Sequence, residues 1–534
     1  MTMTERRPGA TTGADATAAQ PGGPLPAAGA AGWLSTSDHK DVGRLYVVTA
    51  LAFLVLGAVG VALLAVERLQ DDLQVLDGQR FSQLSTLAPE AAVLLFLLPC
   101  FLGLATYLVP LQVGAPDIAF ARGSATAYWT YLIGGGTLLG AYAAGGGVGG
   151  FSDVGTDLYL LSLILLSVAT VAALLSVLTT VLTLRAPGMT MLRTPLFSWS
   201  VLVGGGLLLL VVPVFTARLI ELFISQHFSG ELGGPDAYRQ ISWLWGVPTA
   251  SLLVVPAAGV AAEVVPVLTR GRLRHHHAGM VVLGALALLG FGAWAQVGDS
   301  LDGILYVAVG LAAVLPALAL LGILGDTARR GRFARKAALL LALGAVVHLV
   351  LGSLAGALAV IPGLELRGTA WEAGHFSAIV LGTGVLGAYA ALWYWGPKLW
   401  GVHLGEGAGM AAFFLGFWGA LLLAVADLAN GLLSDQALGA TEFDGEALAP
   451  VLNGAAALGA VMVTLGAALV TGVVVAAWAR HRGTRAVADP WGGATLEWAT
   501  TSPPPPRNFS APLPPVRSPY PLTDVADETE ATGP

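Results

Sequence analysis

The chain has 534 residues, of which 55% are hydrophobic and 11% are charged, and its net charge is −7 at pH 7. Soluble domains carry about 25% charged residues, so the composition excludes a large soluble protein, whose surface would need more polar groups. The negative charge lies mostly in loops and tails and indicates no particular partner, and we expect no nucleic-acid partner.

The N-terminal region, residues 1–36, is rich in Ala, Gly, Pro and Thr and lacks the apolar core of a signal peptide. We therefore expect a disordered cytoplasmic tail, and membrane insertion that begins with the first apolar segment. The one cysteine, Cys100, lies in an apolar stretch. It excludes a disulfide framework or a Cys-based metal site within a single chain.

Twelve segments are long and apolar enough to cross a membrane, since a helix needs about 20 apolar residues for this. Glycine runs such as Gly134–Gly136 favour close helix packing rather than ligand binding. The predicted fold class is an all-α polytopic membrane protein with a twelve-helix domain over 37–480. The predicted spans are 44–66, 91–113, 126–147, 157–184, 195–222, 242–269, 277–297, 303–324, 336–361, 373–397, 409–432 and 450–479.

The loops between these segments predict the orientation. Alternate loops hold most of the basic residues, among them Arg270, Arg272 and Arg274, whereas the loops between them are acidic. By the positive-inside rule, both termini are cytoplasmic and the chain is a multi-pass protein of the cell membrane. Residues 481–534 include Pro503–Pro506 and are expected to form an extended, non-globular cytoplasmic tail.

Five groups of motifs, scattered between about 34 and 509, carry a resemblance to one family. They are SDHK at 37–40, YLVPLQVGAPD at 107–117, LRAPGMT at 184–190 with PLF at 195–197, WG at 245–246 through Glu263 to Pro266, and DPWG at 489–492 with LEW at 496–498. In this order they resemble subunit I of the heme–copper oxidases. The resemblance implies a twelve-helix fold that passes electrons to O2 and pumps protons in aerobic respiration.

The resemblance also implies two hemes and a copper ion held by six histidines, because imidazole nitrogen suits iron and copper. A low-spin heme needs an axial ligand on each face of its ring. In this chain its two ligand positions are Ala88 and Ser377. The position of the single high-spin ligand keeps its histidine, His375, which is the one candidate cofactor-binding residue.

The three copper-ligand positions are occupied by Val247, Gln296 and Val297. Valine cannot ligate a metal, and glutamine is a poor copper ligand. Thr249 and Ser251 stand where the family has a proton-relay glutamate and a redox-active tyrosine. Five of the six ligand positions are therefore replaced, and we expect no metal site and no catalytic residue.

The proton routes of the family are also reduced. Leu320 replaces a lysine of one route, whereas Asp117, at the entrance of the other, remains and is interpreted as a loop carboxylate near the membrane surface. Arg367-Gly368 replaces a His-Asp pair of an interfacial metal site.

Four further polar features lie in or near the spans. His348, like His375, is a membrane-embedded histidine, for which a hydrogen-bonded core role is the alternative to a functional one. Arg367 and Glu372 form an interfacial ion pair or extend separately to the membrane surface. The tract His275–His277 follows three arginines and is interpreted as a lipid-facing basic flank rather than a metal site.

Three functions fit this pattern. The leading one is a cytochrome c oxidase subunit I-like protein that is non-catalytic, a structural or assembly partner of a respiratory complex, with membrane lipid and other oxidase subunits as partners. The second is an active terminal oxidase subunit with displaced ligands. The third is a cofactor-free transporter of protons or a small molecule, with side chains such as Trp294 and Trp371 filling the space of the missing hemes. Among cofactors, we expect none, or one heme at His375.

Overall fold

In the computed structural model, the structure describes residues 32, 35–70, 73–147, 150–228, 241, 246, 249–292, 303–433, 448–480 and 483–531. Ser37–Pro534 forms one compact unit. The predicted N-terminal tail, 1–36, lies almost entirely outside the described residues.

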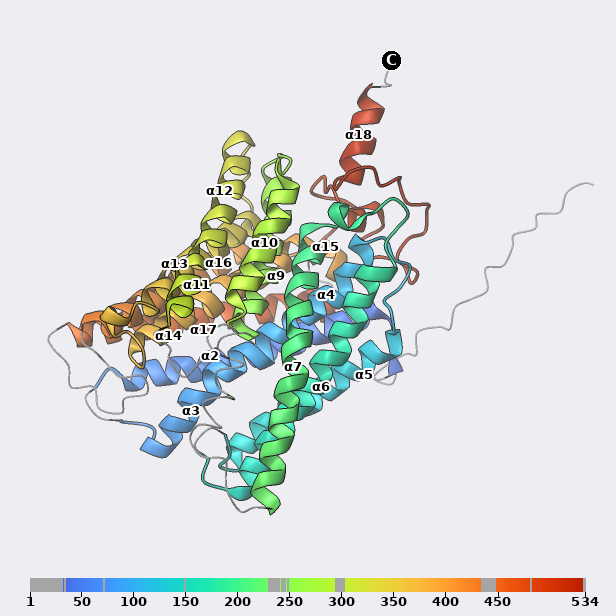
Figure 1. Cartoon of the computed structure of the whole chain (residues 1–534). Coiled ribbons are helices and arrows are strands. Elements are labelled where there is room, and N and C mark those ends of the chain that lie inside the picture. The colour runs from blue at the N-terminus through green and yellow to red at the C-terminus, as the bar shows by residue number, and fades with distance from the viewer. Residues whose placement is uncertain are drawn as a thin grey trace, which may run out of the picture. The chain divides into compact units, whose positions relative to one another are not determined.

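The first half of the compact unit is a series of helices (Figure 1). In chain order they are α2 (His39–Glu67), α3 (Gly78–Glu90), η1 (Ala91–Leu97), α4 (Leu98–Gln112), α5 (Ala121–Ala143), α6 (Asp153–Thr183), η2 (Met191–Arg193), α7 (Leu196–Phe228), α9 (Ala250–Leu268) and α10 (His276–Gly290).

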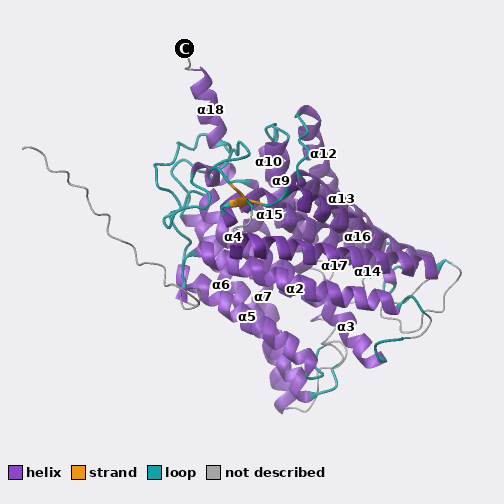
Figure 2. Cartoon of the chain, turned by 180° about the vertical axis from the view of Figure 1, so that it is seen from behind, coloured by secondary structure: helices purple, strands orange, loops and turns teal. Residues whose placement is uncertain are grey.

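The second half continues the bundle and ends in a less regular segment, with one short pair of strands (Figure 2). Its elements are α11 (Ile304–Ala312), α12 (Val314–Arg330), α13 (Ala337–Ala359), η5 (Pro362–Leu364), α14 (Ala370–Phe376), η6 (Ser377–Gly384), α15 (Val385–Trp400), β1 (Val402–His403), α16 (Glu406–Leu433), α17 (Ala449–Arg480), β2 (Thr484–Arg485), η7 (Leu496–Ala499) and α18 (Pro521–Ala531).

Each of the twelve predicted spans overlaps a helix. Within the described part of the chain, ten continuous helices are long and apolar enough to cross a membrane. Of the other two, α10 is apolar but has 15 described residues, and α5 has 23 residues but a less apolar composition. The predicted all-α polytopic fold class is confirmed.

The first and last long helices lie side by side. Thr464 on α17 donates its hydroxyl to the carbonyl of Ala58 on α2 at 2.9 Å, and Thr471 donates to the carbonyl of Leu51 at 3.2 Å. Inside a membrane no water competes for hydrogen bonds, so hydroxyl groups can bond to a carbonyl of a neighbouring helix. These contacts join the two ends of the chain's helical series.

Two π-helical turns interrupt helices of the bundle. The turn η1 continues α3, which contains Pro89, and η6 continues α14. All residues of both turns are buried. Such wide turns are uncommon and often lie at functional sites, and here they begin within three residues of Ala88 and at Ser377.

The C-terminal segment differs from the expected extended tail. Leu496, Glu497 and Trp498 are buried, and Lys398 at the end of α15 donates to the carbonyls of Ala488 and Thr500. The expectation of a non-globular tail is therefore wrong for this part of 481–534. The proline-rich composition suggested a linker, but its interspersed aromatic and leucine side chains bury apolar surface against the bundle.

Candidate functional site

The two low-spin ligand positions lie inside the bundle. Ala88 is 2% exposed on α3, and Ser377 is 7% exposed at the start of η6. The helix α2 covers Ala88 closely, since a methyl group added at Gly60 would lie 3.8 Å from the Ala88 Cβ. A methyl group and a neutral hydroxyl provide no imidazole donor, so these residues do not fit a heme held on both faces.

His375 on α14 is held by the neighbouring helix. Its Nδ1 lies 2.8 Å from the backbone carbonyl of Gly352 on α13. A carbonyl only accepts, so Nδ1 carries the proton and the neutral ring keeps its lone pair on Nε2. A methyl group added at Gly356 would lie 2.9 Å from the His375 Cε1. The lone pair on Nε2 suits one axial bond to heme iron. One edge of the ring is covered by α13.

His348, the other embedded histidine, is fully buried on α13. Its Nδ1 lies 3.0 Å from the carbonyl of Gly344, one turn earlier, and its ring meets Phe417 edge-on with centroids 5.0 Å apart. The Nε2 atom has no hydrogen-bond partner among the described residues. The ring packs against η6 so closely that a methyl group added at Gly382 would lie 2.3 Å from its Cδ2.

The three copper-ligand positions, Val247, Gln296 and Val297, lie outside the described residues, as does Trp294. Of their described neighbours, Thr249 lines an apolar crevice. A methyl group added at Gly290 on α10 would lie 3.2 Å from the Ser251 Cβ. Across the described ranges, no group of three or more His, Cys, Asp or Glu side chains is arranged to hold a metal ion.

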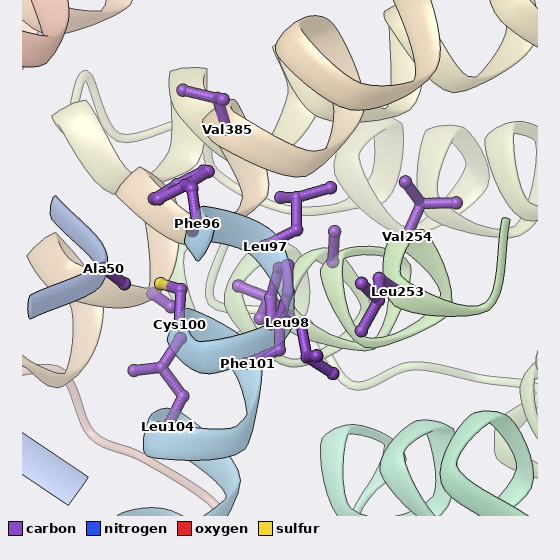
Figure 3. Close-up of a cluster of buried hydrophobic side chains, with 14 of the residues drawn as sticks. Ala50, Phe96, Leu97, Leu98, Cys100, Phe101, Leu104, Leu253, Val254 and Val385 are labelled. Carbon is purple, nitrogen blue, oxygen red and sulfur yellow. The ribbon is translucent and has the colours of Figure 1, made fainter. Parts of the chain in front are cut away.

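Apolar side chains fill the interior where η1, α4, α9 and α15 meet (Figure 3). Leu97 and Val385 both lie in this region, and Leu253 and Val254 approach from α9. All four are at most 4% exposed. Protein interiors pack as densely as organic crystals, so close packing of these helices occupies this region.

A buried carboxylate two residues beyond Ala88 was not predicted. Glu90 accepts hydrogen bonds from the hydroxyls of Tyr142 on α5, at 2.8 Å, and Tyr159 on α6, at 3.0 Å. All three side chains are buried. The signal was an ionisable residue at the border of an apolar run, but the predicted span began at residue 91 and left it out.

A second polar cluster lies at the arginine-rich end of the bundle. The Oε1 atom of Glu497 accepts from Gln112 and Trp395, both at 3.1 Å, whereas its buried Oε2 has no partner among the described residues. Burial raises the pKa of the Glu497 carboxyl. Nearby, Glu263 on α9 accepts from the backbone N–H groups of Leu196 and Phe197 at the start of α7.

A third cluster ties α2, α16 and α17 at the opposite end. Arg68 Nη1 lies 2.8 Å from Asp427 Oδ1, and its Nη2 donates to Asn453 at 3.2 Å. Asn430 also donates to Asn453, at 3.0 Å. The Arg68 and Asp427 side chains are 16% and 4% exposed, so this pair joins three helices at a mostly buried site.

The remaining predicted residues lie apart. Arg367 stacks on the ring of Tyr306 with its guanidinium carbon 4.3 Å from the ring centre, while Glu372 accepts from the backbone of Gly368. Asp117 is exposed.

The other predicted positions face protein. Trp371 is buried and donates to the carbonyl of Ala355. Leu320 is buried. In the tract 275–277, His276 is buried against Tyr520 and its two neighbours are exposed.

Known proteins are similar to this chain over most of its length. The family model described as "Cytochrome C and Quinol oxidase polypeptide I" matches residues 41–462. The "Probable cytochrome c oxidase subunit 1-beta" of Nocardia farcinica is 32% identical, over 92% of this chain and 87% of that protein.

Two further relatives extend the same similarity. The "Probable cytochrome c oxidase subunit 1-alpha" of Streptomyces coelicolor is 31% identical, over 92% of this chain and 89% of that protein. The "Cytochrome c oxidase subunit 1" of Corynebacterium diphtheriae is 29% identical, over 95% of each chain. The chain therefore belongs to the cytochrome c and quinol oxidase subunit I family, the heme–copper oxidases.

Proposed function

We propose that this chain is a non-catalytic member of its family, which serves as a structural or assembly partner of a respiratory complex. The observation that carries the proposal is the donor set, in which five of the six ligand positions hold Ala88, Ser377, Val247, Gln296 and Val297. Members of this family act within respiratory oxidase complexes in membranes. The motifs that shape helix ends remain here, while five of the six groups that would hold iron and copper do not.

In this proposal the chain lies in the cell membrane with both termini in the cytoplasm. The support is the distribution of charge, because the ends of α9, α12 and the loops that follow them are rich in arginine. Short loops rich in basic residues are seldom moved across the membrane and stay on the cytoplasmic side. The C-terminal segment lies at the same end, since Tyr520 donates to the carbonyl of Leu273 in the loop after α9.

The test is the cofactor content and activity of the purified full chain. We expect a pyridine-hemochrome spectrum without heme absorbance, no copper by elemental analysis, and no oxygen uptake with a reduced cytochrome donor. A spectrum of two hemes together with oxygen uptake would refute the proposal and support the displaced-ligand enzyme. A single heme lost in His375→Ala would instead assign a vestigial site to that histidine.

One observation favours transport as a second candidate. Glu90 and its two tyrosine partners form a protonatable cluster in the interior of the bundle, and such groups often mark ion pathways. The test is proton flux into liposomes that contain the purified chain. Flux that is absent in the parent, or unchanged in Glu90→Gln and His375→Ala, would exclude this candidate.

A further inference from the structure

Seven exposed arginines gather in the last turn of α12 and in the loops that join α9 to α10 and α12 to α13. We call them the arginine surface. They are Arg270, Arg272, Arg274, Arg329, Arg330, Arg332 and Arg335. The ends of α10 and α12 point to the same end of the bundle, where α18 also emerges (Figure 1).

The two loops form one unit. The backbone N–H of Arg332 donates to the carbonyl of Thr269 at 2.7 Å. A methyl group added at Gly331 would lie 2.3 Å from that same carbonyl oxygen, so the glycine permits the approach. Asp326 interacts electrostatically with Arg274 as well as with Arg329 and Arg330. Arginines from both loops therefore share one surface.

Most of this positive charge is not neutralised by the chain itself. Asp326 pairs with Arg330 at 2.9 Å and with Arg329 at 3.7 Å. Among the residues that the structure describes, four other arginines of this surface form no ion pair. These are Arg270, Arg274, Arg332 and Arg335. Phe333 lies among them with 53% of its surface exposed, and an exposed aromatic ring beside guanidinium groups is typical of a membrane-surface contact.

The seventh arginine, Arg272, is paired with an acidic helix from the C-terminus. The base of α18 lies beside the loop, because the Tyr520 hydroxyl donates to Leu273 O at 3.2 Å. The Leu522 N–H also donates to Ala494 O in the C-terminal segment, at 3.1 Å. Farther along α18, Asp527 forms an ion pair with Arg272, and both side chains are more than half exposed. Exposed pairs of this kind stabilise little and are screened by salt.

We propose that the arginine surface binds the phosphate groups of anionic phospholipids in the cytoplasmic leaflet, and that α18 competes with the lipid for Arg272. Guanidinium groups bind phosphate through paired N–H donors, and basic clusters next to membrane helices are attracted to anionic headgroups. The leaflet follows from the orientation proposed above. The chemistry of the surface does not depend on it or on whether the chain binds heme.

The experiment uses the full chain in neutral detergent micelles and fluorescent phosphatidylglycerol, with fluorescent phosphatidylcholine as the comparison lipid. Binding is measured by anisotropy at low and physiological salt. The triple variant Arg270→Gln/Arg274→Gln/Arg332→Gln leaves the pair with Asp527 intact. Its affinity for phosphatidylglycerol should fall by about a hundredfold, since each of the three arginines contributes about fivefold. The matched control Arg80→Gln changes another exposed arginine, which lies at the start of α3, and should leave affinity unchanged.

The second variant tests the competition. Asp527→Asn removes the carboxylate that occupies Arg272, so its affinity for phosphatidylglycerol should rise about two- to fivefold, with the larger gain at low salt. This gain does not require the triple variant to fold. Equal binding of the two lipids, or unchanged affinity in both variants, would overturn the proposal. Displacement of the lipid by millimolar inorganic phosphate would assign the surface to a free anion instead.

Discussion

His375 and Gly352 join α14 to α13 through a hydrogen bond of 2.8 Å from the histidine Nδ1 to the backbone carbonyl. The same bond would orient the ring if it held a metal, and it also satisfies a polar group inside a helical bundle. His375→Ala separates these roles, because the proposed function predicts a loss of stability without a loss of any cofactor.

We expect His375→Ala to lower the free energy of unfolding by about 1–3 kcal/mol, because a partly buried side chain and its hydrogen bond are removed. The measurement is thermal unfolding of the purified chain in detergent. His277→Ala, at an exposed position, serves as the control and should change stability by less than about 0.5 kcal/mol. Equal effects of the two substitutions would show that the interhelical bond contributes nothing.

Packing between α14 and α16 gives a second prediction. A methyl group added at Gly374 would lie 2.7 Å from both the carbonyl oxygen of Ala424 and the backbone nitrogen of Leu428. Backbone atoms cannot move aside singly, so Gly374→Ala should force the helices apart and destabilise the fold by about 1–3 kcal/mol. At Gly322 on α12 an added methyl meets nothing within 4 Å. Gly322→Ala should therefore be neutral or raise stability by up to about 1 kcal/mol, and the reverse order would contradict the close packing.

The Glu90 cluster gives a third prediction. Tyr142→Phe removes a hydroxyl that donates to the carboxylate at 2.8 Å and should destabilise the fold by about 1–2 kcal/mol. Tyr389 offers a matched control, since its buried hydroxyl has no partner among the residues that the structure describes. Tyr389→Phe should be neutral or stabilising, because it removes a polar group whose burial is not compensated. A larger loss at Tyr389 than at Tyr142 would rule out this explanation.

The pH dependence of stability provides a fourth prediction. Burial raises the pKa of the Glu497 carboxyl in the folded state, so the folded chain keeps this proton to a higher pH than the unfolded chain does. Its stabilising contribution is complete below the unfolded pKa, about 4.3, and is lost as pH rises through the folded pKa. Melting temperature should therefore fall over this interval, and Glu497→Gln should flatten the fall. Glu372→Gln, at an exposed position, should leave the slope unchanged.

The spans were predictable because hydrocarbon forces each backbone polar group to pair within its own helix, which requires long apolar runs. All twelve predicted segments correspond to helices for this reason. The assignment of Ala88, His375 and Ser377 to helices was predictable from the order of the motifs. The contacts of Glu90 were not, since its partners lie 52 and 69 residues away and apolar periodicity carries no signal for such pairs.

The C-terminal segment was mispredicted for a related reason. Composition marks a proline-rich stretch as a linker, but it does not show that Lys398, at a helix end, faces backbone carbonyls of that stretch. A buried ammonium group requires several acceptors, and here residues 488–501 supply three. The contact depends on how two segments about a hundred residues apart pack in three dimensions, which composition does not reveal.

His39, at the start of the first long helix, contacts Asn508 with a nitrogen–oxygen distance of 2.9 Å, and Lys40 donates to Pro506 O at 3.1 Å. These partners are separated by more than 460 positions. Asp38 caps the first turn of α2 locally, whereas the side chains of His39 and Lys40 find these partners only in the C-terminal segment. A chain cut before residue 506 would lack these acceptors, so His39 and Lys40 at the start of the first long helix would lose partners that no nearby part of the sequence supplies.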